Sequence, residues 1–244
     1  MKPLLKEQLK AFVEQQIPEF HRKRLEKLKE LKLKEVLKRK NPYLFKAKNL
    51  SIAGDLVRSL LDAYLSSQEE TLFGEFLEQL AIRVCEIQFA GRKSGIRGID
   101  LEFENEGVLY VVSIKSGPNW GNASQIEKMQ GYFQAARKTL STNAKPRLME
   151  FVNGCCYGRQ RDNNKGNYRK LCGQAFWELI SGEPNLYTDI VEPIGYKAKE
   201  KNDDFFQQYA IVVNKFTDQF SAQFCMGGSI DWAELVRFNS GRTT

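Results

Sequence analysis

An alternating run followed by a turn and a second β-rich run is the feature that most constrains the fold. Between positions 99 and 104, apolar residues alternate with Asp100, Glu102 and Glu104. Asn105-Glu106-Gly107 follows as a turn signal, and residues 108–114 are rich in β-branched and aromatic side chains. Apolar residues with a period of two are typical of a strand that buries one face. The segment therefore predicts an antiparallel hairpin, and with it a sheet.

The rest of the chain mainly predicts helices. Leucines at three- and six-residue steps predict a helix over 4–40, which Pro18 is expected to kink or divide and Asn41-Pro42 to end. Residues 43–49 are expected to form a connector and residues 154–170 a long polar loop. The other expected elements are helices over 51–66, 70–87, 124–140, 173–182, 203–224 and 231–238, and a short strand over 147–152. This order predicts a mixed α/β fold.

Positive charge is concentrated in the N-terminal part of the chain. Residues 1–50 contain 15 Lys and Arg against 6 Glu, a net charge of +9, whereas all 244 residues together carry +7. Such a concentration favours a polyanion, most often nucleic acid, because binding releases condensed counterions. We therefore expect a basic helical arm (1–50) and a globular domain (51–244). The alternative is that the arm is only a solvated helix face.

Composition excludes several classes of protein. A single histidine, His21, argues against Ser-His-Asp and Cys-His catalysis and against zinc sites with two histidines. The N-terminus lacks the apolar segment of a secretory signal, and no apolar run approaches the roughly 20 residues of a membrane span. The five cysteines, among them Cys155, Cys156 and Cys172, lack zinc-site spacing. We interpret them as buried, reduced thiols of a cytoplasmic protein.

The hairpin gathers residues that suit phosphodiester hydrolysis. Asp100 and Glu102 share one face of the first strand, and Ser113 and Lys115 share one face of the second. Glu78, on a preceding helix, can add a further carboxylate. Carboxylate and carbonyl oxygens suit Mg²⁺, which lowers the pKa of a bound water and neutralises charge on a phosphodiester, and a lysine stabilises the transition state. The alternative is a surface hairpin with a weakly stabilising Asp–Lys ion pair.

These residues also resemble a known family. Gly98-Ile99-Asp100-Leu101-Glu102 and Val112-Ser113-Ile114-Lys115-Ser116-Gly117 resemble the core of PD-(D/E)XK nucleases. More narrowly, residues 41–49 (NPYLFKAKN), 115–122 (KSGPNWGN) and 173–177 (GQAFW) resemble type II restriction endonucleases of the PmeII-like kind. The resemblance implies an αβββαβ core with an N-terminal helical arm and C-terminal helices. It also implies cleavage of double-stranded DNA at a short specific sequence, with Mg²⁺ as cofactor and Mn²⁺ as a substitute.

The resemblance assigns roles to individual residues. Asp100 becomes a metal ligand together with the backbone carbonyl of Ile114, and Lys115 becomes the motif lysine. The second acid of the motif is absent, because position 113 is a serine. We expect Glu78 to replace that acid as a catalytic metal ligand, with Glu102 as the other candidate ligand. A homodimer is expected, because paired cuts in a symmetric site suit two-fold symmetry. A companion DNA methyltransferase is the other expected partner.

Candidate DNA contacts lie after the lysine strand, on the next helix, in a recognition loop at about 154–172 and in the arm. Arginine pairs naturally with guanine, and asparagine or glutamine with adenine. Trp120 is expected either to border the scissile phosphate or to pack in the core. The candidates are Asn119, Gln125, Gln130, Arg159, Gln160, Arg161, Asn163, Asn164, Lys165, Arg169 and Lys170, with Arg22, Lys23 and Arg24 in the arm.

Three functions are compatible with the sequence. The first is a type II restriction endonuclease. The second is a nuclease of the same superfamily that is structure-specific or not sequence-specific and acts in repair or recombination. The third is a catalytically silent DNA-binding protein, which Ser113 and the basic arm suggest.

Overall fold

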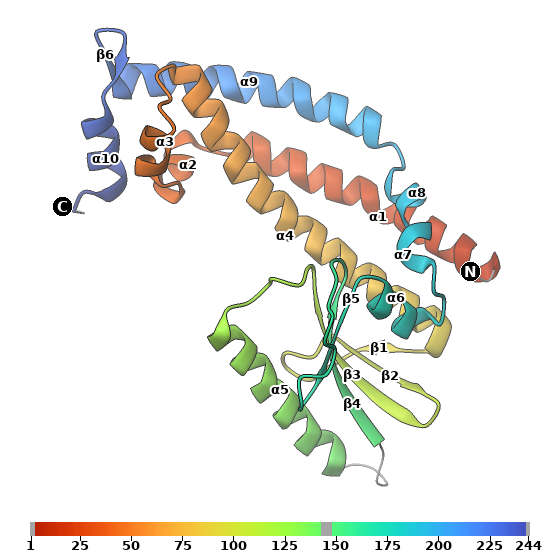
Figure 1. The fold of residues 1–244 in the computed structure, drawn as a ribbon. Helices are drawn as coiled ribbons and strands as arrows, with labels where there is room; N and C mark the ends of the chain where they lie inside the picture. The colour runs from red at the N-terminus through yellow and green to blue at the C-terminus, as the bar shows by residue number, and fades with distance from the viewer. Residues whose placement is uncertain (1–2, 143–147, 243–244) are drawn as a thin grey trace. The chain divides into compact units, whose positions relative to one another are not determined.

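The structure, a computed structural model, describes residues 3–142 and 148–242 (Figure 1). Contacts divide the chain into two compact units. Unit 1 comprises Met1–Ile17 and Phe73–Tyr196, and unit 2 comprises Pro18–Leu72 and Lys197–Thr244. Helix α1 (Pro3–Glu30) and helix α4 (Ala53–Phe89) contribute residues to both. The units do not coincide with the expected division at residue 50, and a separate functional role for residues 1–50 stays a prediction.

Unit 1 is built on a five-stranded mixed sheet in the order β1-β2-β3-β4-β5. Strands β1 (Arg92–Lys93), β2 (Leu101–Asn105) and β3 (Val108–Lys115) are antiparallel neighbours. Strands β4 (Leu148–Cys155) and β5 (Arg169–Cys172) continue the sheet in parallel. The predicted hairpin is confirmed. Its two turn residues, Glu106 and Gly107, have φ angles of 50° and 77°, the left-handed region that a two-residue hairpin turn requires.

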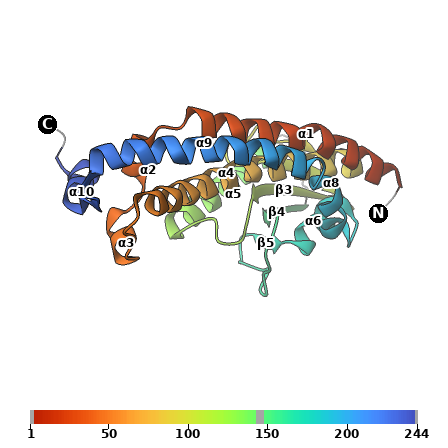
Figure 2. The same ribbon diagram turned by 90° about the horizontal axis from the view of Figure 1, so that it is seen from above.

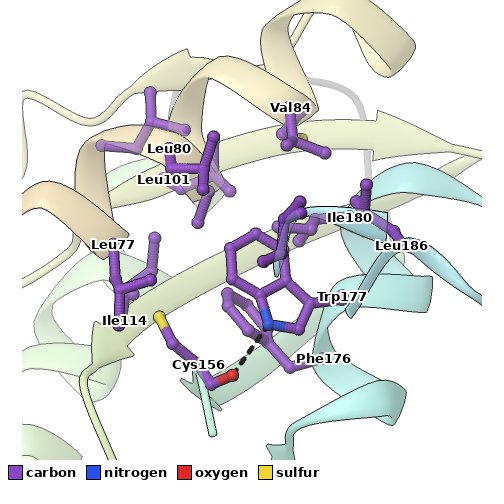
Figure 3. Close-up of a cluster of buried hydrophobic side chains, with 14 of the residues drawn as sticks. Leu77, Leu80, Val84, Leu101, Ile114, Cys156, Phe176, Trp177, Ile180 and Leu186 are labelled. Atoms are coloured by element: carbon purple, nitrogen blue, oxygen red, sulfur yellow. Dashed lines mark hydrogen bonds between the residues drawn. The ribbon is translucent and has the colours of Figure 1, made fainter. Parts of the chain in front are cut away.

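Helices cover both faces of this sheet (Figure 1). Helix α5 (Ala123–Thr142) packs on one face through an apolar cluster that includes Phe133 and Phe151. The C-terminal part of α4 and helix α6 (Gln174–Ser181) pack on the other face. There Trp177 is buried among leucines, and its Nε1–H donates to the carbonyl oxygen of Cys156 at 2.7 Å (Figure 3). The order α4-β1-β2-β3-α5-β4 confirms the expected αβββαβ core.

Unit 2 is helical apart from a small hairpin. It contains α2 (Leu33–Arg39), α3 (Pro42–Ala47), α9 (Ala198–Phe224) and α10 (Trp232–Ser240) with parts of α1 and α4, and the hairpin pairs β6 (Cys225–Met226) with β7 (Ser229–Ile230). Figure 2 shows α9 beside the part of α1 that belongs to unit 2, where Arg24 lies over the Phe205 ring. Apolar side chains from these helices, including Leu28, Leu60 and Phe216, form one buried cluster. Two short helices of unit 1, α7 (Leu186–Asp189) and α8 (Val191–Ile194), were not expected.

Two helix boundaries expected from the sequence are wrong. Helix α1 continues through Pro18 to Glu30, and the chain leaves the helix at residues 31–32 instead. That break lets leucines on both sides of it enter the buried cluster of unit 2. Helix α4 runs unbroken through residues 66–70, where two helices were expected. The hydroxyls of Ser67 and Thr71 each donate to a backbone carbonyl one turn earlier, at 3.1 Å, so polar residues that suggested a helix end are accommodated within the helix.

The expected connector and the expected loop are also partly wrong. Residues 42–47 form α3, because the Asn41 side chain accepts hydrogen bonds from the N–H groups of Tyr43 and Leu44 and Pro42 occupies the first helical position. Strand β4 extends to Cys155, and the expected loop contains β5. Most of the polar segment between these strands is irregular, as expected. The expected start of β4 at Arg147 lies outside the described residues.

Two smaller expectations concern membranes and thiols. In the described part of the chain, no helix is long and apolar enough to cross a membrane. All five cysteines are free thiols, and Cys85, Cys155, Cys156 and Cys172 are buried while Cys225 is half-buried. Burial raises the pKa of Cys156 to about 12, which keeps that thiol protonated.

Candidate active site

The carboxylate of Asp100 reaches across the hairpin to β3. Its Oδ2 accepts a hydrogen bond from the backbone N–H of Ile114 at 2.6 Å and one from the Ser113 hydroxyl at 3.4 Å. The Asp100 N–H in turn donates to the carbonyl oxygen of Val112 at 2.9 Å, which extends the hairpin ladder by one residue. The pairing of the two strands therefore fixes this carboxylate, as the alternation in the sequence predicts.

Lys115 lies at the end of β3 with its ammonium beside the same carboxylate. The Nζ atom is 3.7 Å from Asp100 Oδ2 and donates to the carbonyl oxygen of Ile114 at 2.8 Å. It also lies 5.4 Å from the centre of the Trp120 ring, within the range of a cation–π contact. The ammonium thus contacts both oxygens that the resemblance assigns as metal ligands on the hairpin.

Helix α4 brings Glu78 to this cluster. A Cβ atom built on Gly74 would lie 3.4 Å from the Cβ of Ser116, so the helix packs closely against the end of β3. Glu78 follows one turn later and is half-buried. Burial raises the pKa of the Glu78 carboxyl, and the negative charge of Asp100 raises it further, while Lys93 and Lys115 oppose the shift. The two carboxylates are therefore close enough to repel each other.

The donor atoms in this cluster fit Mg²⁺. Two carboxylates, Asp100 and Glu78, and one backbone carbonyl, that of Ile114, would offer hard oxygen ligands. Mg²⁺ characteristically keeps several waters and takes a phosphate oxygen from its substrate. A divalent cation would also relieve the repulsion that raises the pKa of Glu78. No group of three or more His, Cys, Asp or Glu side chains suited to a metal occurs within residues 3–142 and 148–242. The candidate ligand set therefore consists of two carboxylates and one backbone carbonyl.

Glu102, the other candidate acid, bonds to residues outside this cluster. Its side chain is only 5% exposed and forms an ion pair with Arg92 at 3.0 Å. Its second carboxylate oxygen accepts a hydrogen bond from the Ser94 hydroxyl. Both oxygens therefore hold the edge strand β1 and the turn after it against β2, which gives this carboxylate a structural use.

Sequence reasoning missed one residue beside the cluster, Asn153 on β4. Its side chain is fully buried, accepts a hydrogen bond from the Trp120 Nε1–H at 3.1 Å and donates to the carbonyl oxygen of Ser113 at 3.3 Å. The signal in the sequence is a single amide in the otherwise apolar run from Phe151 to Cys155. Buried amides need partners, so such a residue predicts a specific hydrogen-bonded contact.

Of the polar candidates after β3, Gln125 has a structural contact at the start of α5. Gln125 and Asn122 form a reciprocal helix cap: Asn122 Oδ1 accepts from the Gln125 N–H at 3.1 Å, and Gln125 Oε1 accepts from the Asn122 N–H at 3.0 Å. Gln130 lines a cavity of about 170 Å³ together with Arg137 and Asn167. Asn119 is exposed in the loop after β3.

In the expected recognition loop, some cationic side chains form ion pairs and others do not. Arg159 and Arg161 are exposed, and no described residue forms an ion pair with either. Lys165 lies 3.3 Å from Asp162, and the carbonyl of Asn163 accepts from the Lys170 N–H at 2.8 Å. Gln160 is half-buried and Asn164 is exposed.

The last two cations assigned to this loop lie in β5 instead. Arg169 forms an ion pair with Glu150 on β4. Lys170 donates from Nζ to the carbonyl oxygen of Pro118 at 2.7 Å and so supports the loop after β3. Both side chains therefore have partners within the sheet and its connections.

The three arm candidates, Arg22, Lys23 and Arg24, also have partners. Arg22 pairs with glutamates one turn away on either side, and Lys23 lies 3.9 Å from one of them, Glu19. Arg24 lies over the Phe205 ring at 3.5 Å and pairs with Glu69, and only 13% of its side chain is exposed. A phosphate would have to compete with these internal partners, most of all at Arg24.

A mixed sheet in this order, with an aspartate and a lysine meeting across the hairpin, is the arrangement that the sequence resemblance led us to expect. A family model described as "Type II restriction endonuclease EcoO109I" matches residues 7–202, and the chain belongs to that family. Membership implies sequence-specific cleavage of DNA, so the protein is a site-specific deoxyribonuclease. This outcome favours the first of the three functions. No curated protein matches the chain.

Proposed function

We propose that this restriction endonuclease uses Asp100, Glu78 and the carbonyl oxygen of Ile114 to hold Mg²⁺, and Lys115 to stabilise the reacting phosphodiester. The observation that carries the proposal is the Lys115 ammonium 3.7 Å from the Asp100 carboxylate, with Glu78 half-buried on α4 and its pKa raised by burial and by the charge of Asp100. When bound, Mg²⁺ supplies a water of lowered pKa and neutralises charge on the phosphate.

Each protein group has a role in this proposal. The Ile114 N–H holds the Asp100 carboxylate in one orientation, so little reorganisation is needed when a cation binds. The Lys115 ammonium offers hydrogen bonds to the phosphate or to the attacking water. Glu78 supplies the negative charge that Ser113 lacks, because it approaches the same cluster from α4. The Ser113 hydroxyl contributes only a long hydrogen bond to Asp100.

Recognition of the DNA sequence is proposed for the loop between β4 and β5. Arg159 and Arg161 are exposed cations without internal ion pairs in the described chain, and guanine offers arginine a bidentate partner. Asn163 and Asn164 add amides of the kind that read adenine. Lys165, Arg169 and Lys170 already have partners in the protein, which suits them better to supporting the loop than to reading bases.

We also propose an oligomeric state, a partner protein, a location and a closer group of relatives for this enzyme. The enzyme acts as a homodimer, because a symmetric DNA site presents two equivalent strands to two equivalent subunits. A companion methyltransferase protects the host DNA, and both proteins work in the cytoplasm. The likeness of residues 41–49, 115–122 and 173–177 to PmeII-like enzymes is the basis for placing the chain near that group.

Digestion of phage DNA by the purified protein tests the proposal. We expect discrete fragments in Mg²⁺ or Mn²⁺, none in EDTA, and a common sequence at the fragment ends. Random ends would contradict sequence-specific cleavage. Undiminished cutting in EDTA would contradict the metal role of Asp100 and Glu78.

A further inference from the structure

We propose that Trp120, locked in place by Asn153, is a positioning residue for Lys115. The inference rests on the proposed function, because it concerns the same lysine. Trp120 lies in the loop that joins β3 to α5, and its side chain ties that loop to the neighbouring strand β4.

The indole ring is held by a hydrogen-bonded chain that crosses two strands. Its Nε1–H donates to Asn153 Oδ1 at 3.1 Å, and the Asn153 Nδ2 donates to the Ser113 carbonyl at 3.3 Å. Asn153 is 1% exposed, so losing either bond would leave one polar atom of a buried amide without a partner. This chain fixes the orientation of the ring relative to β3, the strand that carries Lys115.

The ring matters because the other two contacts of the Lys115 ammonium are oxygen atoms that the proposed metal would also use. Nζ is 3.7 Å from Asp100 Oδ2 and 2.8 Å from the Ile114 carbonyl oxygen, the two hairpin oxygens proposed as ligands. With a divalent cation held on these oxygens, the ammonium would be repelled and would lose both acceptors. The Trp120 ring, 5.4 Å from Nζ, attracts a cation without being a metal ligand. It therefore keeps the ammonium beside the site when the metal binds.

A second tryptophan–lysine pair provides a matched control. Trp232 lies 5.2 Å from Lys46 Nζ in unit 2, and neither residue belongs to the cluster around Asp100. Trp120→Phe keeps an aromatic face but loses the Nε1–H, and Trp120→Leu loses both. Trp232→Phe changes a comparable cation–π pair elsewhere.

Single-turnover cleavage and DNA affinity are measured for the three variants, with Ca²⁺ replacing Mg²⁺ in the binding assay. We expect Trp120→Leu to slow cleavage by roughly 10- to 30-fold and Trp120→Phe by a few-fold, the range of a partly desolvated cation–π contact. DNA affinity should change little, and Trp232→Phe should match the wild type. The melting temperature should fall in both Trp120 variants, because Asn153 Oδ1 loses its hydrogen-bond donor. If Trp120→Leu does not fold, Trp120→Phe decides. If Trp120→Leu folds and cleaves DNA at a rate within twofold of wild type, the positioning role is overturned. If only Trp120→Phe folds, the same result for that variant overturns it.

A second readout uses Mg²⁺ alone, without DNA. Calorimetry measures metal binding, and tryptophan emission reports whether a cation has moved near the ring. We expect an emission change on Mg²⁺ binding in the wild type and in Trp232→Phe, and none in Trp120→Phe or Lys115→Met. Mg²⁺ binding without that change, or a change that persists in Lys115→Met, overturns the inference while leaving the proposed metal site intact. Absence of Mg²⁺ binding overturns the proposed function and the inference with it.

Discussion

Asp100 and Lys115 hold opposite charges 3.7 Å apart at the open end of the hairpin, away from its turn, and each has a distinct proposed task. Replacing either residue with alanine should lower the cleavage rate by roughly 10³-fold, because loss of a metal ligand or of the positive charge costs several kcal/mol in the transition state. Ser113→Ala is the neighbouring control and should stay within about tenfold of wild type, since its hydrogen bond to Asp100 is long at 3.4 Å. Rates at fixed Mg²⁺ and melting temperatures of all three variants test this. A folded Asp100→Ala enzyme that cuts normally would remove the aspartate from the mechanism.

We expect Glu78 to make the stability of the protein depend on pH. Burial and the charge of Asp100 raise its pKa in the folded state above the ordinary glutamate value, so the folded state binds the proton more tightly. The contribution of Glu78 to stability therefore falls as the pH rises from the ordinary value through the raised one. In EDTA, Glu78→Gln should gain stability relative to wild type across this window, and Mg²⁺ should abolish the gain by stabilising only the wild type.

Urea unfolding from pH 4 to 8, with and without Mg²⁺, measures how Glu78 changes the free energy of unfolding. Glu70→Gln is the matched control, because Glu70 is exposed on the same helix and is not among the charges that shift the pKa of Glu78. An equal pH profile for wild type and Glu78→Gln would show that the carboxyl does not titrate as its surroundings require.

For single residues, the sequence predicts the contacts of a side chain when its partners lie in the same local element. Strand alternation predicts that Asp100 and Lys115 meet, and the pairing of the hairpin produces that contact. The partners of Asn153 and Arg24 lie more than 30 residues away, so no local pattern reveals them. Glu102 shows the same limit: alternation gives its face, but only the position of the edge strand β1 explains its burial with Arg92.

At the scale of elements, the same distinction explains which helices and strands the sequence predicts. The hairpin and α5 have strong periodic patterns, and their predicted types are confirmed. Ser66 and Ser67 resemble a helix end, so the sequence predicts two helices, yet packing of the residues on both sides keeps α4 continuous. Strand β5 has only four residues, and its parallel partner β4 comes from before a long loop, so neither length nor alternation marks it.

The loop between β4 and β5 should control sequence choice rather than chemistry. Replacing Arg159 and Arg161 with glutamine should reduce cleavage at the specific site by roughly 10- to 100-fold, because a good bidentate pair with a base provides about 1–3 kcal/mol of discrimination. Weak binding to unrelated DNA should persist. Lys138→Gln, an exposed lysine on α5, is the control. Affinities for specific and unrelated duplexes give the ratio, and an equal reduction for both would assign these arginines to phosphates instead.

At the scale of the whole molecule, charge is segregated, with +9 in residues 1–50 and −2 in the remainder. The internal ion pairs of Arg22 and Arg24 leave exposed lysines such as Lys27, Lys29 and Lys34 as the better phosphate ligands. Replacing these three with glutamine should weaken binding to all duplexes alike, because phosphate contacts carry no sequence information. The slope of log affinity against log salt should become shallower by about 0.9 for each phosphate that the variant no longer neutralises.

A variant with equal charge change elsewhere separates this effect from net charge. Lys138, Lys199 and Lys215 are exposed lysines outside residues 1–50, and their replacement by glutamine removes the same three charges. We expect that control to leave the salt slope near the wild-type value, because the condensed counterions are released only where the protein meets the phosphates. Equal slopes for wild type and the Lys27, Lys29 and Lys34 variant would mean that the arm does not contact DNA. Its positive charges would then lie on a solvated helix face, and the phosphate contacts would have to come from residues outside 1–50.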